Sequence, residues 1–232
     1  MTIRARVFGA LCMGFAAWAG LVMANPADAA ETGTGLALPA PGSYTLDHIQ
    51  PVPFGIVLDG NRFPRMLSHY TSGKITLLAF FYSTCADPRG CPLAWEAFEQ
   101  VREAILAQPE LHGRARLVFL SLDPEHDTPD VLKNFTRGYE ASATLVPWYF
   151  LTTYSYLFLN PVLRKMGEEI SIDREASGTD RLVLNHLLKV FLIDQRGWVR
   201  EIYSNQSLDP AAILGDIKTL AIEAANGDSR RR

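Results

Sequence analysis

Residues 75–92 read ITLLAFFYSTCADPRGCP, and this stretch decides the fold. Its first eight residues, 75–82, form a nearly unbroken apolar run with β-branched and aromatic side chains, which is typical of a strand covered on both faces. Pro92 stands where a helix begins, and apolar residues follow at steps of three and four, so the sequence predicts an amphipathic helix over 92–108. A central parallel strand with a helix packed on it is therefore expected.

The chain on either side continues the alternation of strands and helices. Further elements are predicted as a strand at 117–122, a helix at 129–139, a strand at 148–151, a helix ending at 164, a hairpin of 189–194 and 198–203, and a helix at 209–225. Residues 54–63 add an N-terminal β-hairpin. Parallel strands followed by an antiparallel hairpin predict an α/β fold of the thioredoxin-like class, with a central mixed sheet and helices on both faces.

Composition excludes several classes of protein. The 232 residues are 48% apolar and 20% charged, which is ordinary for a globular chain that buries a core without needing disulfides or metals. Twenty-two basic residues against 25 acidic ones give a net charge of −3, with no long basic stripe. We therefore expect no nucleic-acid partner.

The first 29 residues predict export. Arg4 and Arg6 precede an uncharged apolar run, so residues 1–29 are interpreted as a signal peptide or an N-terminal membrane anchor. The expected location is periplasmic, either soluble after cleavage or anchored to the inner membrane. The remaining predicted divisions are a flexible linker at 30–45, the domain at 46–225 and a disordered tail at 226–232. The apolar stretch 145–163 is expected to be a core strand and helix, because its prolines argue against a membrane span.

Cys85 and Cys91 lie between the first core strand and its helix, where α/β proteins place their functional sites. Because Cys91 directly precedes the first helical turn, we expect it to form a thiolate more readily than an ordinary cysteine. A static disulfide between the two cysteines is the structural alternative.

Three separated motifs resemble the Sco/SenC family of thioredoxin-like copper proteins that assist the assembly of cytochrome c oxidase. The motifs are FFYSTCADPRGCP at 80–92, SLDPEHDTP at 121–129, and Asn185-His186 followed by VFLID at 190–194. Together they cover about residues 50–222. Five residues separate the two cysteines, where the family usually has three. Within that loop, Asp87 and Arg89 are expected to be solvated.

The resemblance implies a copper chaperone rather than a turnover enzyme. The family's copper ligands correspond to Cys85, Cys91 and His186, with the two cysteines as a redox pair. Two thiolates and an imidazole suit Cu(I) and accommodate Cu(II). The implied partner is the copper-site subunit of a respiratory oxidase, with another copper chaperone or a thiol reductant as a further partner.

Two enzymatic alternatives stay open at the level of sequence. A thiol-disulfide oxidoreductase would need only Cys85 and Cys91, and would reduce the cysteines of a copper-site apoprotein. A peroxiredoxin-like peroxidase would share the fold but leave His186 without a role. Replacing His186 therefore separates a copper protein from a reductase.

The second motif also permits an acid/base interpretation, but capping explains it better. Asp127 and Thr128 are expected to cap the helix that starts at Pro129, while Asp123 bonds its own turn. Four histidines follow no ligand spacing and are expected at the surface: His48, His69, His112 and His126.

Overall fold

The computed structural model describes residues 38–85, 87–169, 171–174, 182–185 and 187–229. The predicted leader, residues 1–29, and the candidate ligand His186 lie outside these ranges. The described residues belong to one compact unit that begins at Leu38.

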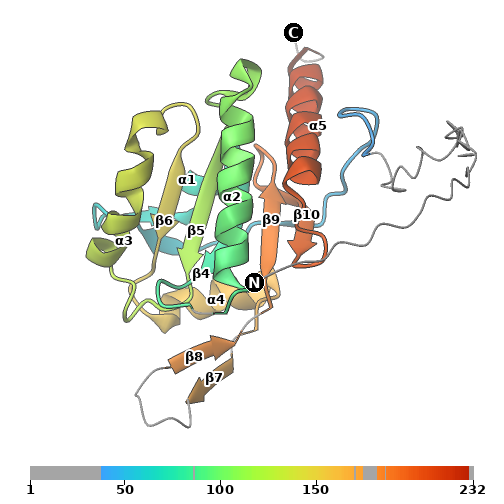
Figure 1. Ribbon diagram of the computed structural model, residues 1–232. Coiled ribbons are helices and arrows are strands. Elements are labelled where there is room, and N and C mark those ends of the chain that lie inside the picture. The colour runs from blue at the N-terminus through green and yellow to red at the C-terminus, as the bar shows by residue number, and fades with distance from the viewer. Residues whose placement is uncertain (1–37, 86, 170, 175–181, 186, 230–232) are drawn as a thin grey trace, which may run out of the picture. The chain divides into compact units, whose positions relative to one another are not determined.

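The centre of the fold is a six-stranded mixed sheet (Figure 1). In spatial order its strands are β1 (Gln50–Pro51), β10 (Trp198–Ser204), β9 (Lys189–Ile193), β4 (Ile75–Phe81), β5 (Ala115–Ser121) and β6 (Trp148–Leu151). Strands β4, β5 and β6 are parallel to one another, β9 runs antiparallel to β4, and β10 runs antiparallel to β9. This is the predicted arrangement, and the mixed sheet of the thioredoxin-like class is confirmed.

Within the described ranges, five α-helices connect or flank these strands. They are α1 (Leu67–Thr71), α2 (Cys91–Leu106), α3 (Pro129–Thr136), α4 (Tyr156–Met166) and α5 (Pro210–Ser229), with 3-10 turns at Pro109–Leu111 and Arg137–Ser142. The predicted N-terminal hairpin is present as β2 (Ile56–Leu58) and β3 (Pro64–Met66). Helix α5 continues to Ser229, four residues beyond the predicted helix end at 225 and into the predicted tail at 226–232.

Helices cover both faces of the sheet, as predicted. Side chains alternate between the two faces along a strand. In β6, the Trp148 ring packs against Trp95 of α2 with ring centroids 5.0 Å apart, while the Tyr149 ring contacts Tyr70 of α1 with centroids 5.0 Å apart. Helices α1 and α2 therefore lie on opposite faces, and Figure 1 shows α5 beside α2 on the same face.

Strands β4 and β5 form the centre of the core, since every residue in both is buried. Their parallel pairing runs in register from Ile75 opposite Ala115 to Phe81 opposite Ser121. Apolar side chains on both faces explain why the sequence shows a continuous apolar run rather than alternation. Consequently the two strands end at the same edge of the sheet.

Two connecting segments differ from what the sequence predicts. Between α4 and β9, where the sequence predicts no strand or helix, the structure contains a separate hairpin of β7 (Ser171–Arg174) and β8 (Leu182–Asn185). The last residues of the predicted flexible linker contact the domain: Gly42 N–H donates to Thr219, and the Tyr44 hydroxyl donates to Asp216 at 2.6 Å. These contacts fasten the chain to α5 before the first strand begins.

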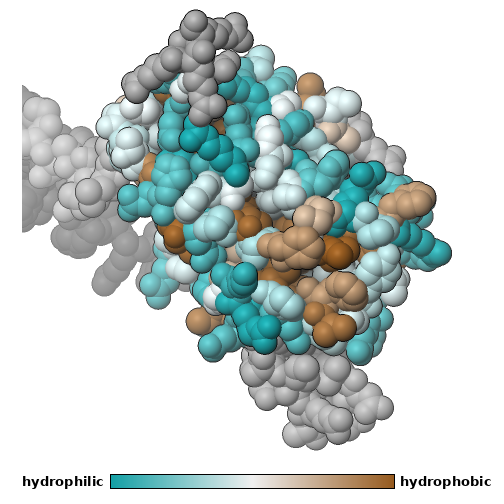
Figure 2. All heavy atoms as spheres, turned by 180° about the vertical axis from the view of Figure 1, so that it is seen from behind, coloured by the Kyte–Doolittle hydropathy of each residue, from teal (hydrophilic) through white to brown (hydrophobic). Residues whose placement is uncertain are grey.

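The apolar stretch 145–163 forms β6 and α4, as expected for a core strand and helix. Among the residues that the structure describes, no helix has the length and apolar character needed to cross a membrane. Some of the stretch stays on the surface, because Tyr154 and Leu157 are 55% and 79% exposed. Figure 2 shows hydrophobic side chains gathered on the rear face of the molecule.

Candidate functional site

Cys85 and Cys91 stand at the carboxyl end of β4. A turn starts as soon as the strand ends, and Cys85 N–H closes it by donating to the Tyr82 carbonyl at 3.1 Å. Cys91 is the first residue of α2 and is 8% exposed, whereas Cys85 is half-buried. The structure therefore places both sulfur-bearing residues in the strand-to-helix crevice that the sequence predicted.

The long loop between the cysteines is closed by its own backbone. Gly90 N–H donates to the Asp87 carbonyl at 3.0 Å, and Arg89 N–H donates to Asp87 Oδ1 at 3.0 Å. An aspartate that bonds a backbone amide two residues later is an Asx turn. Asp87 and Arg89 are exposed as expected, and the carboxylate shapes the loop.

Both cysteines are free thiols in the structure, and they are hydrogen-bonded to each other. The Cys91 thiol donates to Cys85, which lowers the pKa of the Cys85 thiol, with further donors from the backbone amides of Cys91 and Asp87. The same hydrogen bond, together with burial, raises the pKa of Cys91.

The expectation that Cys91 forms a thiolate more readily than an ordinary cysteine is therefore wrong, because its hydrogen bond to Cys85 and its burial raise its pKa. Its position at the start of a helix does favour a thiolate, but Cys91 is the donor in the pair and is the more buried thiol. The structure instead favours Cys85 as the thiolate that accepts hydrogen bonds.

The third predicted ligand, His186, lies outside the described residues. Lys189, three residues later, begins β9, and Val190 pairs with Ala79 near the end of β4. Among the described residues there is no group of three His, Cys, Asp or Glu side chains able to hold a metal ion. The described part of the site thus supplies two sulfur donors.

The loop after β5 reaches the same edge of the sheet, and its aspartates differ from the sequence interpretation. Thr128 occupies the N-cap of α3, but its side chain makes no capping hydrogen bond in the described structure. Asp127 is fully buried and accepts hydrogen bonds from Ser83 N–H at 3.0 Å and from the Ser121 hydroxyl at 2.6 Å. Asp127 therefore joins the loop after β5 to the cysteine loop instead of capping a helix.

Asp123 and the histidines behave mostly as expected. Asp123 bonds its own turn through the ring and backbone of His126, with ring Nδ1 at 2.8 Å from Oδ2. This contact raises the pKa of His126, which remains exposed. His48 and His69 are at the surface, while His112 is partly buried with its Nε2 at 2.9 Å from the Leu106 carbonyl.

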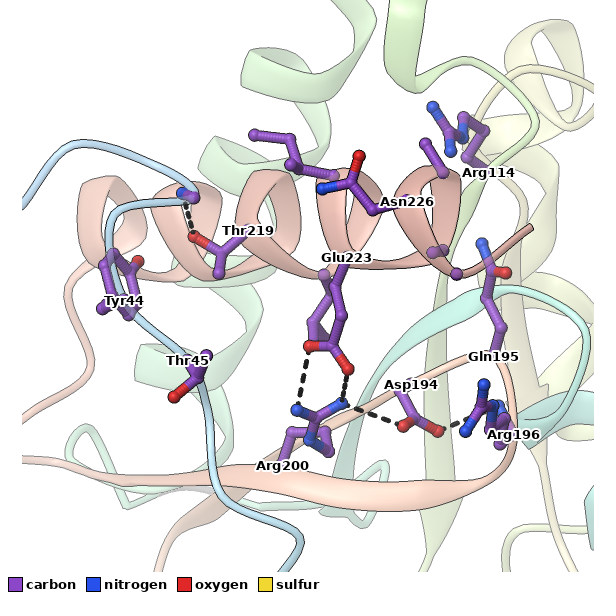
Figure 3. Close-up of a pocket in the computed structure, with 16 residues that line it drawn as sticks. Tyr44, Thr45, Arg114, Asp194, Gln195, Arg196, Arg200, Thr219, Glu223 and Asn226 are labelled. Carbon is purple, nitrogen blue, oxygen red and sulfur yellow. Dashed lines mark hydrogen bonds and ion pairs between the residues drawn. The ribbon is translucent and has the colours of Figure 1, made fainter. Parts of the chain in front are cut away.

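A polar cavity of about 610 Å³ lies at the other end of the sheet (Figure 3). Asp194, on its wall, follows Ile193, which pairs with Thr76 at the start of β4. The cysteines follow the end of β4, so the cavity and the cysteines are at opposite ends. The cavity is therefore separate from the chemistry of the two thiols.

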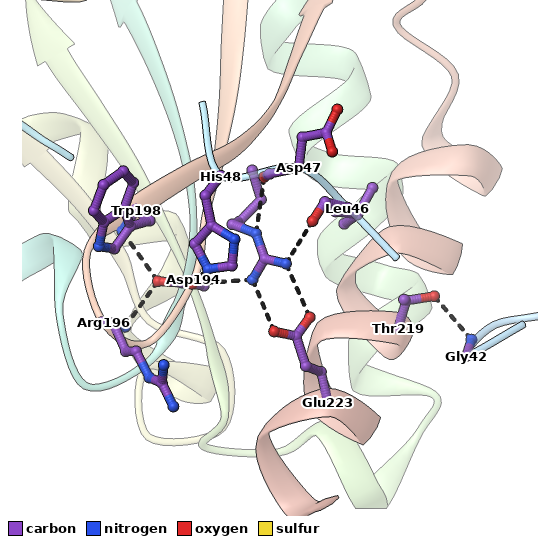
Figure 4. Close-up of polar contacts among 10 residues, drawn as sticks. Gly42, Leu46, Asp47, His48, Asp194, Arg196, Trp198, Thr219 and Glu223 are labelled. Atoms are coloured by element: carbon purple, nitrogen blue, oxygen red, sulfur yellow. Dashed lines mark hydrogen bonds and ion pairs between the residues drawn. The ribbon is translucent and has the colours of Figure 1, made fainter. Parts of the chain in front are cut away.

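Three charged side chains of this cavity are paired, Arg200 with both Asp194 and Glu223 (Figure 4). Arg200 is 3% exposed and donates to Asp194 at 3.1 Å and to both carboxylate oxygens of Glu223. It also donates to the carbonyls of Leu46 and Asp47 in the N-terminal segment. We interpret Arg200 as a structural link between that segment, β9 and α5.

Comparison with known proteins places this fold and its cysteines in a family. A sequence model of the family described as SCO1/SenC matches residues 65–222, which is more than half of the chain. The chain belongs to the SCO1/SenC family. The matched range contains both cysteines, the aspartate loop and the β9–β10 hairpin.

Two relatives named as SCO proteins are similar to this chain at low sequence identity. The SCO1 protein homolog of Bacillus subtilis is 26% identical over 148 residues, covering 63% of this chain and 71% of that protein. Protein SCO2, mitochondrial, of Saccharomyces cerevisiae is 28% identical over 126 residues, or 54% of this chain. The match spans only 38% of the yeast protein's length.

Solved structures agree on the fold. The structure of Arabidopsis thaliana ScoI with copper bound superposes with a TM-score of 0.63 at 17% identity, covering 75% of this chain and 99% of that chain. At that identity the likeness establishes the fold, which is the thioredoxin-like fold of the SCO1/SenC family.

Proposed function

We propose that this protein is an exported copper-binding metallochaperone that helps assemble the copper site of a respiratory oxidase. The observation that carries the proposal is the pair of free, hydrogen-bonded thiols at the end of β4 in a chain of the SCO1/SenC family. The family's copper-bound relative from Arabidopsis supports copper as the cargo.

The donor set suits copper. Cys85 and Cys91 supply two thiol sulfurs, and soft sulfur ligands select Cu(I). We propose His186 as the third ligand. Its support is the motif that carries it and the register of β9, which begins at Lys189 beside the end of β4. An imidazole added to two thiolates would also accommodate Cu(II).

Redox state would gate loading and release. In the dithiol state, Cys85 and Cys91 lose protons as they bind copper. Forming a disulfide from the two thiols releases two protons and two electrons to an acceptor, and it removes both thiolates as ligands. A thiol reductant in the exported compartment would restore the dithiol, and another copper chaperone would supply the metal.

The client would be the copper-site subunit of the oxidase. Export is supported by the basic and then apolar character of residues 1–29, which would act as a cleaved signal or as a membrane tether. We place the domain in the periplasm, where it would meet the exposed copper site of its client.

One observation favours a second function, that of a thiol-disulfide oxidoreductase. Cys85 is more exposed than Cys91 and has the lowered pKa, while Cys91 is buried behind it. An exposed nucleophile with a buried resolving partner is the arrangement that thiol-disulfide exchange uses. In that case the two cysteines would reduce a copper-site apoprotein without binding copper.

Copper content of the reduced chain tests the proposal. The wild type and the variants Cys85→Ala, Cys91→Ala and His186→Ala would be loaded with copper, freed of excess metal and analysed for copper per chain. We expect one copper in the wild type and loss of bound copper in each variant. His69→Ala is the matched control, because His69 is exposed on α1 and should leave copper binding unchanged.

A reduced wild-type chain that binds no copper would overturn the proposal of a metallochaperone. Reductase activity towards a disulfide substrate then tests the alternative function, that of a thiol-disulfide oxidoreductase. An oxidoreductase should keep that activity in His186→Ala and lose it in either cysteine variant.

A further inference from the structure

The hydrogen-bond ladder between β4 and β5 stops just before the cysteine loop. Its last strand pair is Phe81 with Ser121, and Leu122 N–H still donates to the Phe81 carbonyl at 2.7 Å. Ser83, two residues further along, pairs with no strand in the part of the chain that the structure describes. Its N–H donates instead to Asp127 Oδ2 at 3.0 Å. A side chain thus replaces the missing strand partner.

The carboxylate of Asp127 is itself held by the loop after β5. The Ser121 hydroxyl donates to Oδ2 at 2.6 Å and accepts a hydrogen bond from Asp123 N–H at 2.9 Å. Asp127 N–H donates to the Asp123 carbonyl at 2.8 Å. These three contacts turn the loop back over the end of β5, so the carboxylate has one orientation.

The contact with Ser83 bears directly on Cys85. Ser83 lies inside the turn that Cys85 N–H closes onto the Tyr82 carbonyl. Only Thr84 separates Ser83 from Cys85. Fixing Ser83 therefore fixes the backbone from which the Cys85 sulfur projects towards Cys91.

The burial of Asp127 lowers the stability of the fold. Asp127 is 0% exposed, and its Oδ1 has no hydrogen-bond partner among the described residues. A buried polar atom without a hydrogen-bond partner lowers the free energy of unfolding, so closing a turn with a buried carboxylate destabilises the folded chain. Helix capping does not explain it, because Asp127 precedes the N-cap Thr128 and bonds Ser83 and Ser121 instead.

We propose that Asp127 is a positioning residue for the copper loop. By accepting the Ser83 N–H, it sets the position of the Cys85 sulfur relative to Cys91, without contacting the metal. The inference rests on the proposed copper site. It identifies the group in the loop after β5 on which the geometry of that site depends.

Two substitutions separate positioning from charge. Asp127→Ala removes the acceptor for Ser83 N–H, whereas Asp127→Asn keeps an acceptor oxygen of the same reach and removes the charge. Asp130→Ala is the matched control, since Asp130 is an aspartate on α3 whose exposed carboxylate pairs with Arg62. Copper affinity would be measured against a competing chelator, and the Cu(II) absorption spectrum would report the ligand geometry.

We expect Asp127→Ala to weaken copper binding by about 10-fold to 100-fold, as changes behind metal ligands do, and to shift the Cu(II)-thiolate band. Asp127→Asn should restore both towards the wild type, and Asp130→Ala should change neither. Unchanged affinity and spectrum in Asp127→Ala would overturn the proposal. So would an Asp127→Asn variant as weak as Asp127→Ala, because the charge would then be what matters.

Two additions keep the test decisive. If Asp127→Ala fails to fold, Ser121→Ala loosens the carboxylate and should shift the spectrum in the same direction, and an unchanged spectrum would overturn the proposal. The alkylation rate of Cys85 in copper-free protein is a readout that does not depend on metal. This rate should change in Asp127→Ala and return to the wild-type rate in Asp127→Asn. The same result is expected if the wild type binds no copper, so the positioning role of Asp127 is tested separately from the proposed metallochaperone function.

Discussion

Glu168 is a buried acid that the proposed copper chemistry does not use. Its side chain is 1% exposed, and neither carboxylate oxygen has a hydrogen-bond partner among the described residues. Burial raises its pKa to about 7, and Lys189 Nζ, at 3.9 Å from Oε1, only partly offsets that rise. The group therefore titrates close to neutral pH.

This shift predicts how stability depends on pH. A carboxyl group whose folded pKa lies above its unfolded value binds more protons in the folded chain. Its contribution to stability is full below about pH 4.5 and is lost as the pH rises through about 7. We expect the loss to be at most about 3 kcal/mol over that window.

Denaturant unfolding at pH 5, 6, 7 and 8 checks the prediction in wild type and Glu168→Gln. The free energy of unfolding of the wild type should fall relative to the variant as the pH rises. Subtracting the variant cancels the titration of all other groups. A difference that stays constant across the four pH values would contradict a raised pKa at Glu168.

The positions of the two cysteines could be predicted from the sequence, but which of the two thiols has the lower pKa could not. Position at a helix start argued for Cys91 as the thiolate, and that information is visible in the sequence. Which thiol is buried, and which donates to the other, depends on how the loop folds, and this favours Cys85. Asp127 was missed for a similar reason, because its partner Ser83 is 44 residues away in the chain.

At the scale of elements, α2, β5 and β6 are joined by an aromatic cluster centred on Phe119. Phe119 is 0% exposed, and its ring lies 4.6 Å from Phe98, 5.1 Å from Phe81 and 5.2 Å from Trp148. Removing a buried ring leaves a cavity that the packed neighbours cannot fill. We expect Phe119→Ala to lower the free energy of unfolding by about 3–5 kcal/mol.

Phe54→Ala is the matched control for that measurement. Phe54 is 67% exposed, so the same change of side chain should alter the free energy of unfolding by less than about 0.5 kcal/mol. Equal losses in the two variants, measured by denaturant unfolding, would show that Phe119 does not organise the core.

Most elements could be predicted from sequence because their signals are local. The strand at Ile75–Phe81, the Pro92 helix and the Gln195–Gly197 turn each carry their own pattern of apolar residues, proline or glycine. The β7–β8 hairpin has no such pattern: its strands are four residues each, and Ser171–Arg174 reads as polar. A strand of four residues is too short to show a clear hydrophobic periodicity, so such strands are not predicted from the sequence.

At the scale of the whole molecule, Arg200 joins three distant parts of the chain. It lies at the irregularity in the pairing of β10 with β9 and bonds Asp194, Glu223 and the carbonyl of Leu46. Removing one partner of a buried ion pair leaves the other charge unpaired. We expect Arg200→Ala to lower the free energy of unfolding by about 3–5 kcal/mol.

The exposed pair of Arg62 and Asp130 provides the comparison. Both side chains are more than 60% exposed, so Arg62→Ala should lower the free energy of unfolding by less than about 1 kcal/mol. Denaturant unfolding of the two arginine variants beside the wild type measures the difference. If Arg200→Ala were as mild as Arg62→Ala, Arg200 would not hold the N-terminal segment against the domain.

We propose that Cys85, Cys91 and His186 together hold copper, and X-ray absorption of the reduced, copper-loaded chain tests this ligand set. We expect two sulfur ligands and one imidazole nitrogen around each copper, with the nitrogen lost in His186→Ala. A copper environment without two sulfur ligands, or one that His186→Ala leaves unchanged, would contradict it.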